Sequence, residues 1–161
     1  MKKEYFILCF LVLLLGCNDI ENCDADQNRN FIVVRFYDLE TQESKKVGFT
    51  FTAENSPNRF VFAADTTIST ASGDTTIISD STVIGLPLNP EAGISTFYFD
   101  SDTSSHQIAL SYLTEFSLLD PDCEPSLTFT NLDTVRQTFD STVVVNSVTN
   151  IFVETNIEVY F

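Results

Sequence analysis

Residues 31–37 read FIVVRFY, and this stretch decides the fold expected for the whole chain. It combines β-branched and aromatic residues, which are enriched in strands, and turn-forming Asn30 and Asp38 bound it. Comparable segments recur along the sequence, separated by turn signals. They are residues 47–52, 59–63, 82–88, 95–99, 106–118, 127–130, 141–147 and 157–161, with a predicted hairpin formed by residues 65–68 and 74–77.

These segments predict an all-β protein. Residues 47–52 alternate apolar with small or polar side chains, as a half-buried strand does, and Pro87 places its own segment at a sheet edge or a strand end. Roughly eight to ten short strands are typical of an antiparallel β-sandwich, immunoglobulin-like or a related Greek key. The chain has no Trp, which excludes the Cys-Trp-Cys core of antibody domains, and its 15 Phe residues are expected to fill the core.

The amino-terminal stretch predicts export. Lys2 and Lys3 precede the apolar residues 5–15, and Leu-Leu-Gly then leads into Cys17. Eleven apolar residues rise only about 16 Å as a helix, against roughly 30 Å of hydrocarbon, so this is no membrane span. The Leu-Leu-Gly-Cys sequence resembles the lipobox of bacterial lipoproteins, in which the Cys becomes the lipid-bearing first residue. The alternative is an ordinary secretory signal with a Cys near its end by chance.

The expected organisation follows from this signal. Residues 1–16 form a lipoprotein signal peptide, residues 17–30 a lipidated acidic tether and residues 31–161 the β-sandwich domain. Each buried CH₂ of an acyl chain contributes about 0.8 kcal/mol, so several chains on Cys17 would hold the domain firmly on a membrane. The expected location is the bacterial outer membrane, with the periplasmic and the surface-facing side both left open.

Charge bounds the partners of the domain. The chain has 8 Lys and Arg against 23 Asp and Glu, for a formal net charge of −15. Such a surface offers no basic stripe for nucleic acid, and anionic lipid would repel it. Solubility of an exported domain explains the acidity, with an acidic binding face as the alternative.

Cys9 would be removed with the signal peptide, so two cysteines remain beside the lipidation site. Cys23 and Cys123 are 100 positions apart, and an exported, oxidising compartment favours a disulfide between them. The chain-entropy model gives about 4.7 kcal/mol for closing a loop of that length. A metal pair or two free thiols are the alternatives, although no further His or Cys lies near either cysteine in sequence to complete a zinc site.

Catalytic motifs were weighed against simpler interpretations. His106 is the single histidine, so a Ser-His-Asp relay would run through it, and a solvated residue at a strand end is the preferred interpretation. No Gly-x-Ser-x-Gly elbow and no phosphate-binding glycine loop occur. Tyr37 and Tyr98 are candidates for a sugar platform, but packing between strands is preferred. Asp120 and Asp122 exemplify paired carboxylates of the kind that a glycosidase uses, although such pairs arise by chance in an acidic chain. The acidic pairs that are candidate calcium ligands, with turn formation as the preferred interpretation, are Asp24 and Asp26, Asp100 and Asp102, and Asp120 and Asp122.

A set of motifs in order along the chain carries one family resemblance. They are the lipobox, Cys23, Arg35-Phe36-Tyr37-Asp38, Leu86-Pro87-Leu88, Thr96-Phe97-Tyr98-Phe99, Leu110-Ser111-Tyr112, Cys123, Phe129-Thr130-Asn131-Leu132, Asn150-Ile151-Phe152 and Val159-Tyr160-Phe161. In this arrangement the chain resembles an uncharacterised family of small two-cysteine Bacteroidota lipoproteins. Glu124-Pro125 departs from the Gly expected after the second Cys. The resemblance implies a location and a fold, and no activity.

The sequence thus leads to a functional hypothesis without a cofactor or a metal. We expect a lipid-anchored, non-enzymatic β-sandwich of the cell envelope that binds a protein or glycan partner or serves as an accessory module. The alternative is a pilus-like or envelope-assembly subunit that pairs through its edge strands. A hydrolase that uses acidic residues is a third hypothesis.

Overall fold

The computed structural model describes residues 30–57, 61–63, 69–70, 76–117, 126–149 and 154–161 of the chain. All regular elements in these ranges are β-strands. They are β1 (Phe31–Tyr37), β2 (Val47–Glu54), β3 (Phe62–Ala63), β4 (Ser69–Thr70), β5 (Thr76–Ser81), β6 (Val83–Pro87), β7 (Ile94–Asp100), β8 (Ser105–Ser117), β9 (Ser126–Gln137), β10 (Ser141–Val144) and β11 (Ile157–Tyr160).

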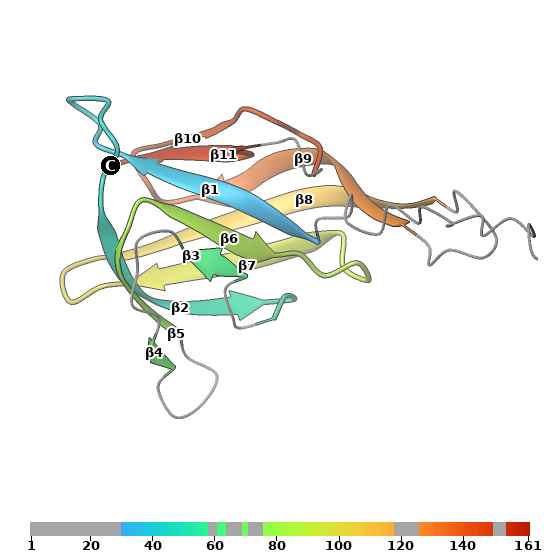
Figure 1. Ribbon diagram of the computed structural model, residues 1–161, viewed down its shortest axis with the longest axis horizontal. Helices are drawn as coiled ribbons and strands as arrows, with labels where there is room; N and C mark the ends of the chain where they lie inside the picture. Colours follow the sequence, from blue (N-terminus) through green and yellow to red (C-terminus); the bar gives the residue numbers. More distant parts are fainter. Residues whose placement is uncertain (1–29, 58–60, 64–68, 71–75, 118–125, 150–153) are drawn as a thin grey trace, which may run out of the picture.

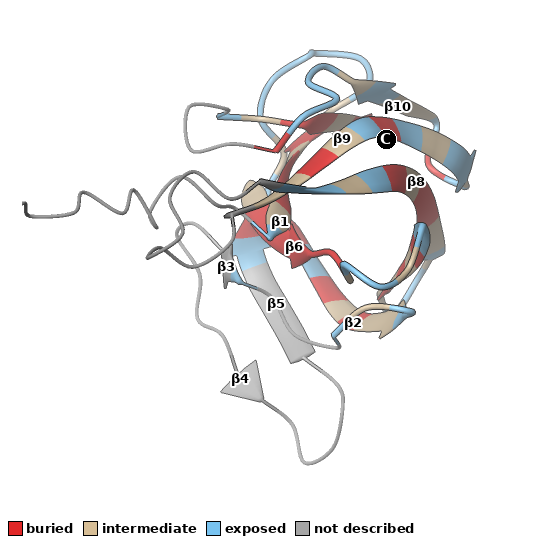
Figure 2. Cartoon of the chain, turned by 90° about the vertical axis from the view of Figure 1, so that its right-hand side faces the viewer, coloured by how far each residue is buried: buried red, intermediate tan, exposed pale blue. Residues whose placement is uncertain are grey.

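The strands form two sheets that pack face to face, and the predicted β-sandwich is confirmed (Figure 1). One sheet has the strand order β10-β11-β1-β6-β3, and the other has the order β4-β5-β2-β7-β8-β9. The buried residues of the core lie on strands of both sheets, which are coloured by burial in Figure 2. The fold therefore has one core, enclosed by strands from every part of the described chain.

Strand β1 lies in the middle of its sheet, and its bounds are those that the sequence predicts. Ile32, Val34 and Phe36 are fully buried. The strand pairs antiparallel with β6 and parallel with β11, where Val34 lies opposite Ile157. This parallel pair departs from the antiparallel pattern expected. Parallel neighbours are joined by long connections and not by a tight turn, so local turn signals do not announce them.

Phenylalanines build the core, as their number in the sequence predicts. Phe36 has the ring centroids of four others between 5.8 and 6.4 Å away, at interplanar angles from 49° to 87°. Tilted and edge-on contacts of this kind are the favoured geometry for aromatic pairs. The four partners are Phe49, Phe99, Phe139 and Phe161.

The remaining strand predictions hold with adjusted bounds. Pro87 is the last residue of β6, and β6 lies between β1 and β3, so Pro87 marks a strand end and not a sheet edge. β4 and β5 pair antiparallel, with Thr70 opposite Thr76, whereas most of the predicted hairpin at 65–77 lies outside the described residues.

Strands β8 and β9 form a hairpin of 13 and 12 residues, and β9 is much longer than the predicted segment 127–130. The pairing of β8 with β9 shifts register between Ser111 and Leu113 of β8. Asn131 of β9 lies opposite this shift, and its φ is 52°. This irregularity breaks the alternation of apolar and polar residues, which is the signal that sequence analysis follows.

The edge of β9 is covered by the segment 147–149. The N–H of Leu132 donates to the carbonyl of Ser147 at 3.0 Å, and the N–H of Thr149 donates to the carbonyl of Phe129 at 2.9 Å. The Thr149 hydroxyl accepts from the N–H of Phe129 at 3.0 Å. Backbone groups that are bonded within the chain cannot pair with another strand. This part of the edge therefore gives no support to assembly through edge strands.

Candidate functional site

The three cysteines that the sequence singles out lie outside the described residues. Cys17 and Cys23 precede residue 30, and Cys123 falls within residues 118–125. The acidic pairs at 24 and 26 and at 120 and 122 lie outside as well. Lipidation of Cys17 and the disulfide between Cys23 and Cys123 therefore stay predictions.

The described residues show where the predicted tether joins the domain. The segment 88–90 links the start of β1 to β8: its first N–H donates to the carbonyl of Asn30 at 3.0 Å. Its middle residue exchanges two hydrogen bonds with the Tyr112 hydroxyl, at 3.3 and 3.0 Å. Its last carbonyl accepts from the Thr114 hydroxyl at 3.1 Å. The chain thus enters the sandwich at the end where β8 runs on toward residue 117.

His106 lies at the opposite end of β8, where its half-buried ring packs against the rim of the aromatic core. Its ring stacks on Phe139 with centroids 4.4 Å apart at 8°, and lies 5.7 Å from the ring of Phe161. Its Nδ1 lies 3.3 Å from the carbonyl of Thr138. The histidine is therefore a partly exposed strand-end residue, as the sequence suggested, whose ring also packs on Phe139. Nothing in these contacts activates a nucleophile.

Lys45 contacts Phe161 at the outer side of the same aromatic cluster. Its Nζ lies 4.1 Å from the centroid of the Phe161 ring, a cation–π contact, and donates to the Phe161 carbonyl. It also forms an ion pair with Asp38 at 3.9 Å. Hydrogen bonds from the N–H groups of Thr41 and Glu40, with the nearby Lys45 charge, keep the pKa of Asp38 below its usual value.

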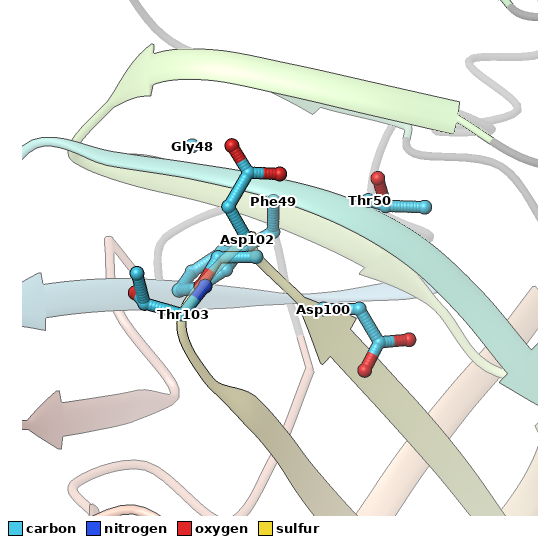
Figure 3. Close-up of a pocket in the computed structure, with 7 residues that line it drawn as sticks. Gly48, Phe49, Thr50, Asp100, Asp102 and Thr103 are labelled. Carbon is cyan, nitrogen blue, oxygen red and sulfur yellow. The ribbon is translucent and has the colours of Figure 1, made fainter.

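An open pocket of about 490 Å³ lies between β2 and the turn that joins β7 to β8 (Figure 3). Gly48, Phe49 and Thr50 line one side, and residues 100–103 line the other. The turn is fixed by its own hydrogen bonds: the N–H of Ser101 donates to the carbonyl of Ser104 at 2.8 Å. Of the three acidic pairs named from the sequence, Asp100 and Asp102 in this turn are the pair that lies within the described residues.

The two carboxylates of this pocket do not converge on one point. The side chains of Asp100 and Asp102 extend in different directions (Figure 3). Asp100 accepts a hydrogen bond from the Ser105 hydroxyl at 2.5 Å. Calcium gathers six to eight oxygen ligands, and no group of three or more metal-ligating side chains occurs in the part of the chain that the structure describes. The pocket can offer carboxylate and hydroxyl groups to a polar ligand, and Asp100 and Asp102 act here as turn residues.

The two tyrosines weighed as a sugar platform each contact another side chain. The Tyr37 ring stacks on Tyr160 with centroids 5.2 Å apart at 21°, which occupies one face of each ring. The hydroxyl of Tyr98 donates to Glu54 at 3.1 Å, and that hydrogen bond raises the pKa of Tyr98. These contacts favour packing between strands, as preferred from the sequence.

No pattern in the sequence singles out Phe116. Its ring is 70% exposed, the largest value among the exposed large hydrophobic residues of the described chain. The alternation of β8 would place it in the core, on the face of Leu110 and Tyr112. Only the tertiary arrangement shows that the strand extends beyond that core.

Comparison of the chain with models of protein families, with curated proteins and with solved structures found no match. None of the described residues forms a helix long and apolar enough to cross a membrane.

Proposed function

We propose that this chain is a lipid-anchored lipoprotein of the bacterial outer membrane whose β-sandwich is a non-enzymatic binding or accessory module. The amino-terminal sequence carries the proposal: Lys2 and Lys3, the apolar residues 5–15, and Leu-Leu-Gly before Cys17. Membership of the family of small Bacteroidota lipoproteins belongs to the same proposal.

The start of the sandwich supports this arrangement. β1 begins at Phe31, so residues 18–30 connect an acylated Cys17 to the domain. Thirteen residues span at most about 45 Å when extended, and about 20 Å as a flexible coil. The domain would therefore stay close to the bilayer and still be able to turn toward an envelope protein or glycan.

The described side chains support binding over catalysis. His106 is stacked on Phe139, and its ring nitrogen contacts the backbone carbonyl of Thr138. The carboxylates of Asp100 and Asp102 point apart, whereas a glycosidase pair faces one bond from two sides. Steady hydrolysis of a defined substrate by the purified protein, lost in His106→Ala or Asp100→Asn, would contradict the non-enzymatic role.

Metabolic labelling tests the anchor directly. We expect the full chain, expressed in bacteria fed an alkyne fatty acid, to carry the label and to sediment with membranes. Cys17→Ser should lose the label and leave the membrane fraction. Cys9→Ser is the matched control, because Cys9 lies inside the apolar run and should not affect labelling. A wild-type chain without label, or a labelled Cys17→Ser chain, rules the proposal out.

A further inference from the structure

The core-facing side of β8 continues past the core. Ile108, Leu110 and Tyr112 on this face are 0 to 3% exposed. Phe116, four residues beyond Tyr112 on the same face, is 70% exposed. Its cross-strand partner is Leu127, which is only partly buried against the core. The hairpin thus carries an apolar face beyond the sheet that would cover it.

The other face of the same hairpin end is also apolar in part. Leu113 is 56% exposed, next to a polar cross-strand contact in which the Thr130 hydroxyl donates to Glu115 at 2.8 Å. We call Leu113 and Phe116 the hairpin end. Folding leaves these two large apolar side chains, on opposite faces of a narrow hairpin, exposed to water. Contact with another apolar phase would bury them.

The hairpin end lies where the tether enters the domain. Both views place the start of β1 and the far ends of β8 and β9 on the same side of the molecule (Figures 1 and 2). The hydrogen bonds of segment 88–90 to Asn30, Tyr112 and Thr114 fix this arrangement. Phe116 is only two residues beyond Thr114.

We propose that the hairpin end rests on the bilayer that holds the acyl chains of Cys17, with the Phe116 ring at the lipid–water interface. This inference rests on the proposed lipid anchor. One exposed ring would not hold a free protein on a membrane. A tether of 13 residues makes the contact intramolecular, however, and so raises the effective concentration of the surface.

Charge indicates which lipids suit this contact. The chain has a formal net charge of −15, and the sequence joining β8 to β9 contains Asp120, Asp122 and Glu124. An anionic surface would repel such a domain. The contact should therefore be closer on zwitterionic vesicles than on vesicles that contain anionic lipid.

The absence of tryptophan from the chain allows a clean test. Phe116→Trp introduces a single indole into the acylated full chain, which is reconstituted into phosphatidylcholine vesicles with brominated acyl chains. Val135→Trp is the matched control: Val135 is 58% exposed in β9, next to Arg136, which pairs with Ala109. Seven residues separate Ala109 from Phe116, or about 23 Å along the strand. Unfolding midpoints equal to wild type establish that both variants fold.

We expect blue-shifted F116W emission that brominated lipid quenches at least twofold more than the V135W emission. Adding anionic lipid should reduce the difference. Equal quenching of the two variants, in protein shown by mass to be acylated and by sedimentation to be vesicle-bound, overturns the membrane contact and leaves the anchor intact. A blue shift without quenching, together with a dimer on cross-linking, means that a second copy covers Phe116 and also overturns it. Absence of acylation removes the proposed function and this contact with it.

Discussion

Asn156 and Val33 are joined by a pair of hydrogen bonds between the two ends of the described chain. The N–H of Val33 donates to the Asn156 side-chain oxygen at 3.0 Å, and the N–H of Asn156 donates to the Val33 carbonyl at 2.9 Å. The amide nitrogen of the same side chain donates to the carbonyls of Asn146 and Val148, at 3.2 and 3.1 Å. At 2% exposure, this one amide satisfies three backbone groups.

Asn156→Ala should therefore be strongly destabilising. It removes partners from backbone groups that stay buried, and each unsatisfied group costs about 1–3 kcal/mol. We expect the free energy of unfolding in urea to fall by about 3 kcal/mol, within the range of a buried-network loss. Asn146→Ala is the matched control, because the Asn146 side chain is exposed and makes one hydrogen bond, to the Thr155 carbonyl. Equal losses in the two variants would contradict this role of Asn156.

Tyr112→Phe should weaken the domain at neutral pH. The Tyr112 hydroxyl lies 2.7 Å from the Ser95 hydroxyl, which is fully buried, and bonds the backbone of Asn89. Losing these contacts should cost about 1–2 kcal/mol in urea unfolding at pH 7. Tyr37→Phe, a change on the outer sheet surface, should stay within about 0.5 kcal/mol of wild type.

The same tyrosine gives an expectation at alkaline pH. Burial raises the pKa of Tyr112 above 10.0, so the neutral hydroxyl is favoured in the folded state. The unfolded chain then releases its proton at a lower pH than the folded chain does. The resulting stabilisation is present below pH 10 and is lost as the pH rises through the raised pKa. The free energy of unfolding, measured from pH 9 upward, should fall less steeply with pH for Tyr112→Phe than for the wild type. Identical slopes for the two proteins would contradict this.

Two Phe→Ala changes should separate core from surface. Phe36 is fully buried among four rings, and truncation should cost about 3–5 kcal/mol through lost burial and a cavity. Phe116, at 70% exposure, should change stability by less than about 1 kcal/mol when truncated in a detergent-free soluble form. Thermal unfolding of the two variants measures the difference. A comparable loss at Phe116 would mean that its ring is covered in the folded domain.

The disulfide predicted between Cys23 and Cys123 can be tested by mass, since both cysteines lie outside the described residues. We expect the mature protein to be two hydrogen atoms lighter before reduction than after it. Cys123→Ser should lower stability by about 4–5 kcal/mol on the chain-entropy model. Cysteines that alkylate without reductant would show that the bridge is absent.

Local patterns predicted the elements better than their partners. Residues 31–37 are rich in β-branched and aromatic residues and are bounded by turn residues, and β1 occupies them without adjustment. The extent of β9 was missed because the irregularity at Asn131 interrupts the alternation. Whether the rings of His106 and Phe116 are packed or exposed depends on which other parts of the fold reach them. No local sequence pattern encodes this. The lipidated cysteine and the disulfide are predicted from the sequence alone, because their cysteines lie outside the described residues.

The parallel pairing of β1 with β11 has a consequence for biogenesis. Val34 lies opposite Ile157, 123 positions later, so β1 lacks one neighbour until that residue is available. A polypeptide that crosses a membrane channel amino terminus first delivers β1 early and β11 late. Ladders between such distant positions also form slowly. If the chain is exported as proposed, the five-stranded sheet closes only after translocation has passed residue 157, and a chaperone that shields β1 during transit would bind its unpaired edge.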